Sequence, residues 1–77
     1  MNNIRRKRLQ KIIDSIEDLK TEFEFIKDEE VESFENIPEN LQGSERYERA
    51  EEAVDNLDSA FDSLEEAISY IEDAIEA

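Results

Sequence analysis

Residues 47–75 read YERAEEAVDNLDSAFDSLEEAISYIEDAI, and apolar side chains recur in this stretch at alternating steps of three and four residues. The repeat comprises Tyr47, Ala50, Val54, Leu57, Phe61, Leu64, Ile68, Ile71 and Ile75. Such steps form a heptad repeat, whose seven positions are lettered a to g and whose apolar positions are a and d. The stretch therefore predicts a long helix that needs an apolar partner.

The N-terminal part of the chain carries a second heptad repeat. It comprises Leu9, Ile12, Ile16, Leu19, Phe23 and Ile26. Phe34 lies eleven residues beyond Phe23, close to three full turns of a helix. We therefore expect one helix over about residues 3–35, with Asn2 or Asn3 as its N-terminal cap.

The segment between the two repeats, NIPENLQGS, holds the only proline and the only glycine of the chain. Pro38 disfavours a continuing helix, and Gly43 can adopt the positive φ that a chain reversal needs. Ser44 can cap the second helix. One short helical turn is expected over Pro38 to Gln42, with Ile37 and Leu41 covering this end of the core.

Together the repeats predict an all-α fold, an antiparallel two-helix hairpin of the coiled-coil type. In an antiparallel pair each a residue lies opposite a d residue of the other helix. When the two residue numbers of every such pair add up to 80, the chain reverses at residue 40, which is the centre of the proline–glycine segment. The expected core pairs are Leu9–Ile71, Ile12–Ile68, Ile16–Leu64, Leu19–Phe61, Phe23–Leu57 and Ile26–Val54. We expect one domain over residues 1–77, with the turn at about 36–44 and the second helix at about 45–76.

Charge is distributed unevenly, with 23 acidic and 9 basic residues and a net charge of −14. Residues 1–11 hold five basic and no acidic side chains. In a hairpin this segment lies beside the acidic C-terminal end of the second helix, where the acids and the negative end of the helix dipole stabilise its positive charges. The basic segment therefore has a structural explanation. The flanking e positions face one another and predict three ion pairs: Lys27–Glu51, Lys20–Asp58 and Arg6–Glu72.

A chain of 77 residues buries only about 60% of its unfolded surface, so a lone hairpin is marginally stable. We expect two hairpins to form a homodimeric four-helix bundle. The candidate second contact surface is a stripe of small residues at g: Ala53, Ala60, Ala67 and Ala74. The alternative is that alanine occurs there only because it favours helices.

No pattern for catalysis or ligand binding is recognisable. Cysteine and histidine are absent, which excludes disulfides, thiolate or imidazole metal sites and the commonest nucleophile–base pairs. The carboxylates lack the loop geometry of a calcium site. We therefore expect no enzyme activity, cofactor or metal. Apolar runs never exceed two residues, so no membrane span is expected and the cytoplasm is the default location.

Two aromatic residues fall outside the repeats, at c positions. Phe25 and Tyr70 are either packed locally or exposed. Because a large exposed aromatic side chain can anchor a partner, Phe25 is a candidate contact.

The block NIPENLQGSERYERAEEAVDNLDSAFDSLEEAI, with the basic opening RRKRLQKIID, resembles a group of short acidic, uncharacterised helical-hairpin proteins of Gram-positive bacteria and their phages or mobile elements. The resemblance covers nearly the whole chain. It implies a cytoplasmic or phage-borne hairpin and transfers no activity and no site residue.

The function predicted from these features is that of a small protein-binding or assembly module. The alternative is an acidic mimic of nucleic acid that inhibits a DNA- or RNA-binding protein, for example in anti-restriction or anti-CRISPR action, with a basic partner. Its acidic surface would include Glu52, Asp55, Asp62, Glu66 and Asp73. A third possibility is an RNA-binding dimer that uses the basic N-terminal segment. Direct nucleic-acid or membrane binding is otherwise disfavoured by the net charge.

Overall fold

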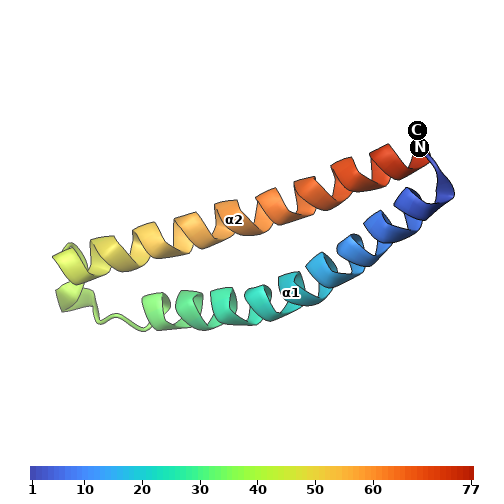
Figure 1. The fold of residues 1–77 in the computed structure, drawn as a ribbon. Helices are drawn as coiled ribbons and strands as arrows, with labels where there is room; N and C mark the ends of the chain where they lie inside the picture. Colours follow the sequence, from blue (N-terminus) through green and yellow to red (C-terminus); the bar gives the residue numbers. More distant parts are fainter.

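The computed structural model describes all 77 residues. Its elements are helix α1 (Asn3–Glu35), a short 3-10 helix η1 (Glu39–Leu41) and helix α2 (Glu45–Glu76). Helices α1 and α2 lie side by side and antiparallel, so both termini are at the same end of a molecule of 59 × 17 × 13 Å (Figure 1). The all-helical hairpin is confirmed, and the helix bounds coincide with those predicted.

Both N-terminal caps form as predicted. Asn2 Oδ1 accepts a hydrogen bond from the backbone N–H of Arg5 at 2.8 Å, and Ser44 Oγ accepts one from the N–H of Tyr47 at 3.2 Å. Each cap satisfies a backbone donor that the first helical turn leaves free, so both helices begin directly after these residues. Gly43 has a φ of 93°, in the left-handed region that favours glycine.

The turn end of the hairpin is closed by aromatic and aliphatic side chains. The rings of Phe34 and Tyr47 lie 4.9 Å apart between centroids, and Ile37 is buried. Leu41 stays 38% exposed. Ile37 therefore covers this end as expected, whereas Leu41 does so only in part.

Helix α2 presents the predicted face to α1. All nine residues of its heptad repeat are half-buried or buried, and Ile68 is the most buried of them. The acidic residues of α2 all lie outside this face and are exposed, so the large apolar side chains of α2 other than Tyr70 share one face.

Helix α1 presents a different face from the one its repeat predicts. Its d residues are largely exposed: Ile12 (49%), Leu19 (63%) and Ile26 (52%). The prediction that these three side chains fill the hairpin core is wrong. Phe61, expected to meet Leu19, lies against Phe23 with ring centroids 6.4 Å apart.

The e residues of α1 take the place of its d residues. Ile13 is only 3% exposed, and Lys20 and Lys27 are half-buried. Both ammonium groups lie over the Phe61 ring, at 5.4 and 4.7 Å from its centroid. A lysine can cover apolar surface with its aliphatic stem while its charge reaches an acid. Turning α1 toward e therefore buries Ile13 and also brings two cations to the acidic helix.

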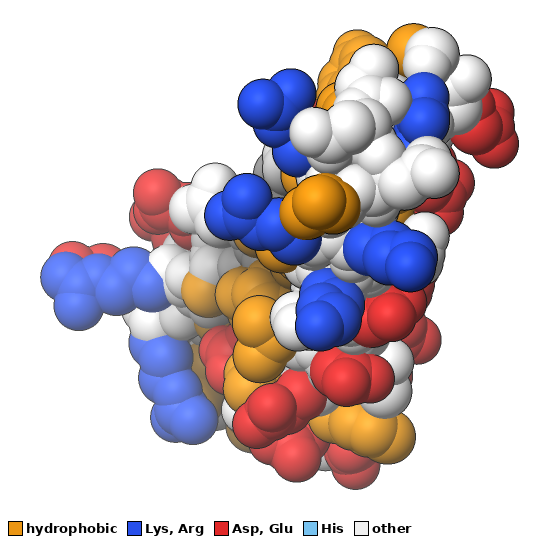
Figure 2. Space-filling model, turned by 45° about the vertical axis from the view of Figure 1, so that its right-hand side comes forward, with side chains coloured by type: hydrophobic (Ala, Val, Ile, Leu, Met, Phe, Trp, Pro, Cys, Tyr) orange, Lys and Arg blue, Asp and Glu red, His pale blue; other side chains and the backbone are white.

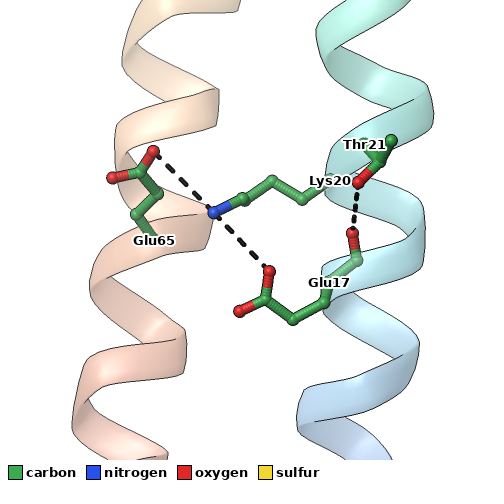
Figure 3. Close-up of polar contacts among 4 residues, drawn as sticks. All are labelled: Glu17, Lys20, Thr21 and Glu65. Atoms are coloured by element: carbon green, nitrogen blue, oxygen red, sulfur yellow. Dashed lines mark hydrogen bonds and ion pairs between the residues drawn. The ribbon is translucent and has the colours of Figure 1, made fainter.

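The ion pairs between the helices form between the e residues of α1 and α2, as expected, but each lysine pairs with a different acid from the one predicted. Lys27 Nζ lies 3.0 Å from Asp58 Oδ1. Lys20 Nζ lies 3.8 Å from Glu65 Oε1, as Figure 3 shows. Each lysine was expected to meet the acid one heptad nearer the turn, so this prediction is wrong. Helical side chains lean toward the N-terminus of their own helix, and α1 lysines therefore reach toward the C-terminus of α2.

Arg6 links the two helices at the end of the hairpin where both termini lie. Its Nε donates to the carbonyl oxygen of Ile75 at 2.9 Å, and its Nη2 donates to that of Ala77 at 3.2 Å. These contacts replace the expected ion pair with Glu72. They place a cation at the negative end of the α2 dipole, as predicted for the basic segment.

The hairpin core is thin. Only Ile13, Ile37 and Ile68 are buried, and the chain exposes 5972 Å². A compact monomer of 9.0 kDa exposes about 4,900 Å². The chain thus exposes about 1,000 Å² more than a compact fold of its mass. Neither helix has an apolar stretch long enough to cross a lipid bilayer.

Candidate protein-binding surface

The largest set of exposed apolar side chains follows one line along α1. Ile12, Leu19 and Ile26 are spaced by seven residues, so successive members lie about 10.5 Å apart on the same side of the helix. We call these three residues the α1 stripe. Met1 and Ile4 are also exposed near its N-terminal end. Large apolar side chains that are exposed on the same side of a helix are typical of protein–protein contacts.

The α1 stripe is separate from the face that packs on α2. Consecutive helical residues diverge by about 100°, so Ile13 points into the hairpin while Ile12 points sideways. A helix with two apolar faces about a right angle apart can contact two neighbouring helices. This is the situation of each helix in a four-helix bundle.

The alanine stripe of α2 lies on the same side of the hairpin as the α1 stripe. In an antiparallel pair the e residues of both helices share one edge and the g residues share the other. The ion pairs of Lys20 and Lys27 mark the e edge. The g edge is therefore on the opposite side of the hairpin. The exposed d residues of α1 lie next to the g residues of α1, and the alanine stripe consists of g residues of α2, so both stripes lie on the side of the g edge. Ala60 and Ala67 are exposed, and Ala53 and Ala74 are half-buried.

The acidic residues of α2 avoid this side. All twelve of them fall at b, e or f, and none falls at c, d or g. The c positions hold Arg49, Asn56, Ser63 and Tyr70. The acidic candidate residues are all exposed, on the remaining sides of α2: Glu52, Asp55, Asp62, Glu66 and Asp73. The structure thus separates an acid-free side of α2 from an acidic one.

The two aromatic residues at c are both exposed. Phe25 retains 66% and Tyr70 retains 67% of its accessible surface. The reading in which they pack locally is wrong, and Phe25 stays a candidate contact.

A shallow hollow adjoins the α1 stripe near the N-terminus. Met1, Arg5, Arg8, Leu9 and Ile12 line it. In Figure 2, which turns the end with the termini forward, Lys and Arg side chains surround exposed hydrophobic ones. The α1 stripe is therefore flanked by positive charge at this end.

The ion pair between Lys27 and Asp58 changes the titration of the lysine. The hydrogen bond to the Asp58 carboxylate raises the pKa of Lys27 above the ordinary lysine value. No group of three or more acidic side chains is arranged to hold a metal ion.

Comparisons with protein-family models, curated proteins and solved structures give no match. The resemblance to short acidic proteins of Gram-positive bacteria and phages therefore stays a prediction.

The sequence reasoning missed the α1 stripe because it assigned those residues to the core. A signal was present: α1 carries apolar residues at a, d and also at e, where Ile13 lies. One neighbouring helix covers a narrow stripe, so apolar residues at a and d, with Ile13 and the aliphatic stems of Lys20 and Lys27 at e, indicate a second contact.

Proposed function

We propose that this chain is a non-enzymatic protein-binding and assembly module, whose first partner is a second copy of itself. Two hairpins close into a four-helix bundle by covering the α1 stripe. The observation that carries the proposal is the exposure of Ile12, Leu19 and Ile26 on a helix that already has a packed face.

The area of exposed surface supports this proposal. Stable interfaces bury about 600–1,000 Å² on each partner. The chain exposes about 1,000 Å² more than a compact monomer of its mass, so one such interface would remove the excess. The acidic sides of α2 then remain outside, available to a further, basic partner.

Size-exclusion chromatography with light scattering tests the proposal. The chain should elute with about twice its mass of 9.0 kDa at micromolar concentration. Leu19→Glu should give the mass of one chain, because it places a charge in the contact. Thr21→Glu is the matched control: it adds the same charge two residues away on an exposed part of α1 and should leave the dimer intact.

A single-chain mass for the unmodified protein with full helicity would refute self-association. Equal masses for the two variants would show that the α1 stripe is not the contact.

The exposed acids of α2 support a second candidate function, the inhibition of a nucleic-acid-binding protein by mimicry. In that case a basic protein captured by the chain should be released by duplex DNA and by moderate salt, since both compete with the carboxylates. Capture that resists DNA and salt but fails with Phe25→Ala would favour the protein-binding module proposed first.

A further inference from the structure

We infer that the second copy binds antiparallel, with α1 against α1 across a twofold axis at Leu19 and the two turns at opposite ends. This inference rests on the self-association proposed above and specifies its geometry.

The first argument is the distribution of charge along α1. Residues 1–11 hold five basic and no acidic side chains, whereas residues 28–35 hold five acidic and no basic ones. A twofold axis at Leu19, the middle of the α1 stripe, sets the basic end of each α1 against the acidic end of the other. Arg8 then faces Glu29 of the second copy at the g edge. A parallel pairing of the same helices would bring five cations against five cations.

The second argument comes from the other helix. The centre of the alanine stripe lies midway between Ala60 and Ala67. The contacts of Lys20 with Glu65 and of Phe23 with Phe61 place this part of α2 beside Leu19. One axis therefore lies at the centre of both stripes, and it sets Ala60 of one copy opposite Ala67 of the other.

The competing arrangement lays α1 of one copy over α2 of the other, with both turns at one end. The acid-free side of α2, which carries the alanine stripe, would then face α1 of the second copy. The basic residues of α1 would find no acidic partner on that side. In the antiparallel arrangement Arg8 finds Glu29, and the alanines let the two α2 helices approach closely. Charge complementarity on the contact side thus favours α1 against α1.

Cysteine cross-linking of the full chain tests the geometry, because the natural sequence has no cysteine. In a glutathione redox buffer, Leu19→Cys should form a disulfide-linked dimer at least tenfold more readily than Leu41→Cys. Leu19 lies on the axis, whereas the two copies of Leu41 lie at opposite ends of a bundle at least as long as the 59 Å hairpin. Light scattering on the reduced variants shows whether each still self-associates.

The outcomes separate this inference from the proposal beneath it. Preferential linking of Leu41→Cys, or no preferential linking in variants that are still dimeric, would overturn the antiparallel geometry and leave self-association standing. Variants and unmodified chain that are all monomeric would overturn both.

A charge exchange gives an independent readout. Arg8→Glu and Glu29→Arg should each raise the dimer dissociation constant at least threefold, and the double variant should return it to within twofold of the original. Lys7→Glu is the matched control, since it makes the same change next to Arg8 at an outward f position. No recovery in the double variant, or an equal effect of the control, would contradict the pairing.

Discussion

Truncation of Leu19 to alanine should weaken the dimer strongly while it leaves the hairpin itself almost unchanged. Leu19 keeps 63% of its surface exposed in the hairpin, so little of its burial contributes to the folding of one chain. Alanine is also a good helix former. The unfolding free energy of the monomer should therefore fall by no more than about 1 kcal/mol, the share of the buried third of the side chain.

The effect on dimerisation follows from the surface that remains to be buried. Complete burial of a leucine side chain stabilises by about 1.5–3 kcal/mol, so the exposed part accounts for about 1–2 kcal/mol in each copy. Both copies lie at the axis, which gives about 2–4 kcal/mol for each dimer. Because the alanine retains Cβ, we expect the lower part of this range, a rise in the dissociation constant of about 30- to 100-fold.

Sedimentation equilibrium over a series of concentrations measures this constant, and circular dichroism checks that helicity is kept. Leu41→Ala is the matched control, because it removes the same atoms from an exposed leucine at the turn, outside the proposed contact. A dissociation constant for Leu19→Ala within threefold of the unmodified value, or equal effects of the two substitutions, would refute the reasoning.

Three further predictions concern the hairpin itself. Gly43→Ala should lower the unfolding free energy in urea by about 1–2 kcal/mol through backbone strain alone, since φ is 93° and no atom crowds the site; an unchanged midpoint would contradict this. Arg6→Met should cost about 1 kcal/mol by removing two hydrogen bonds to the end of α2, whereas Arg5→Met should cost less, and equal losses would count against the role of Arg6. The pKa of Lys27 is raised by Asp58, so the pair stabilises the fold below the ordinary lysine pKa and loses its effect as pH rises through the raised value. Between about pH 9 and 12 the unfolding free energy should fall more for the unmodified chain than for Lys27→Met, and parallel curves would refute this.

The fold was predictable from the sequence because several independent signals agree. The large apolar residues of α2 at a and d are flanked by acids at e and by small alanines at g, so the repeat allows one orientation. Ser44 and Gly43 mark the chain reversal by their chemistry, and both act as expected.

The orientation of α1 was not predictable in the same way. Its apolar residues at a and d, with Ile13 at e, allow two ways of facing α2, and the choice depends on Lys20 and Lys27 at e. Their stems cover Phe61 while their charges reach acids on α2. A heptad analysis counts lysine as a polar residue, so it does not take into account that the aliphatic part of a lysine side chain can cover an apolar ring. The alanine stripe was therefore identified as a candidate contact, whereas the larger apolar stripe on α1 was not.

Isotope-filtered nuclear Overhauser spectroscopy on an equimolar mixture of labelled and unlabelled chains tests the burial of the α1 stripe most directly. We predict intermolecular contacts between the methyl groups of Ile12 in one chain and Ile26 in the other, with Leu19 contacting its own counterpart. A spectrum without any intermolecular signal from these three residues, at concentrations where the chain is fully helical, would contradict the claim that a second copy covers them.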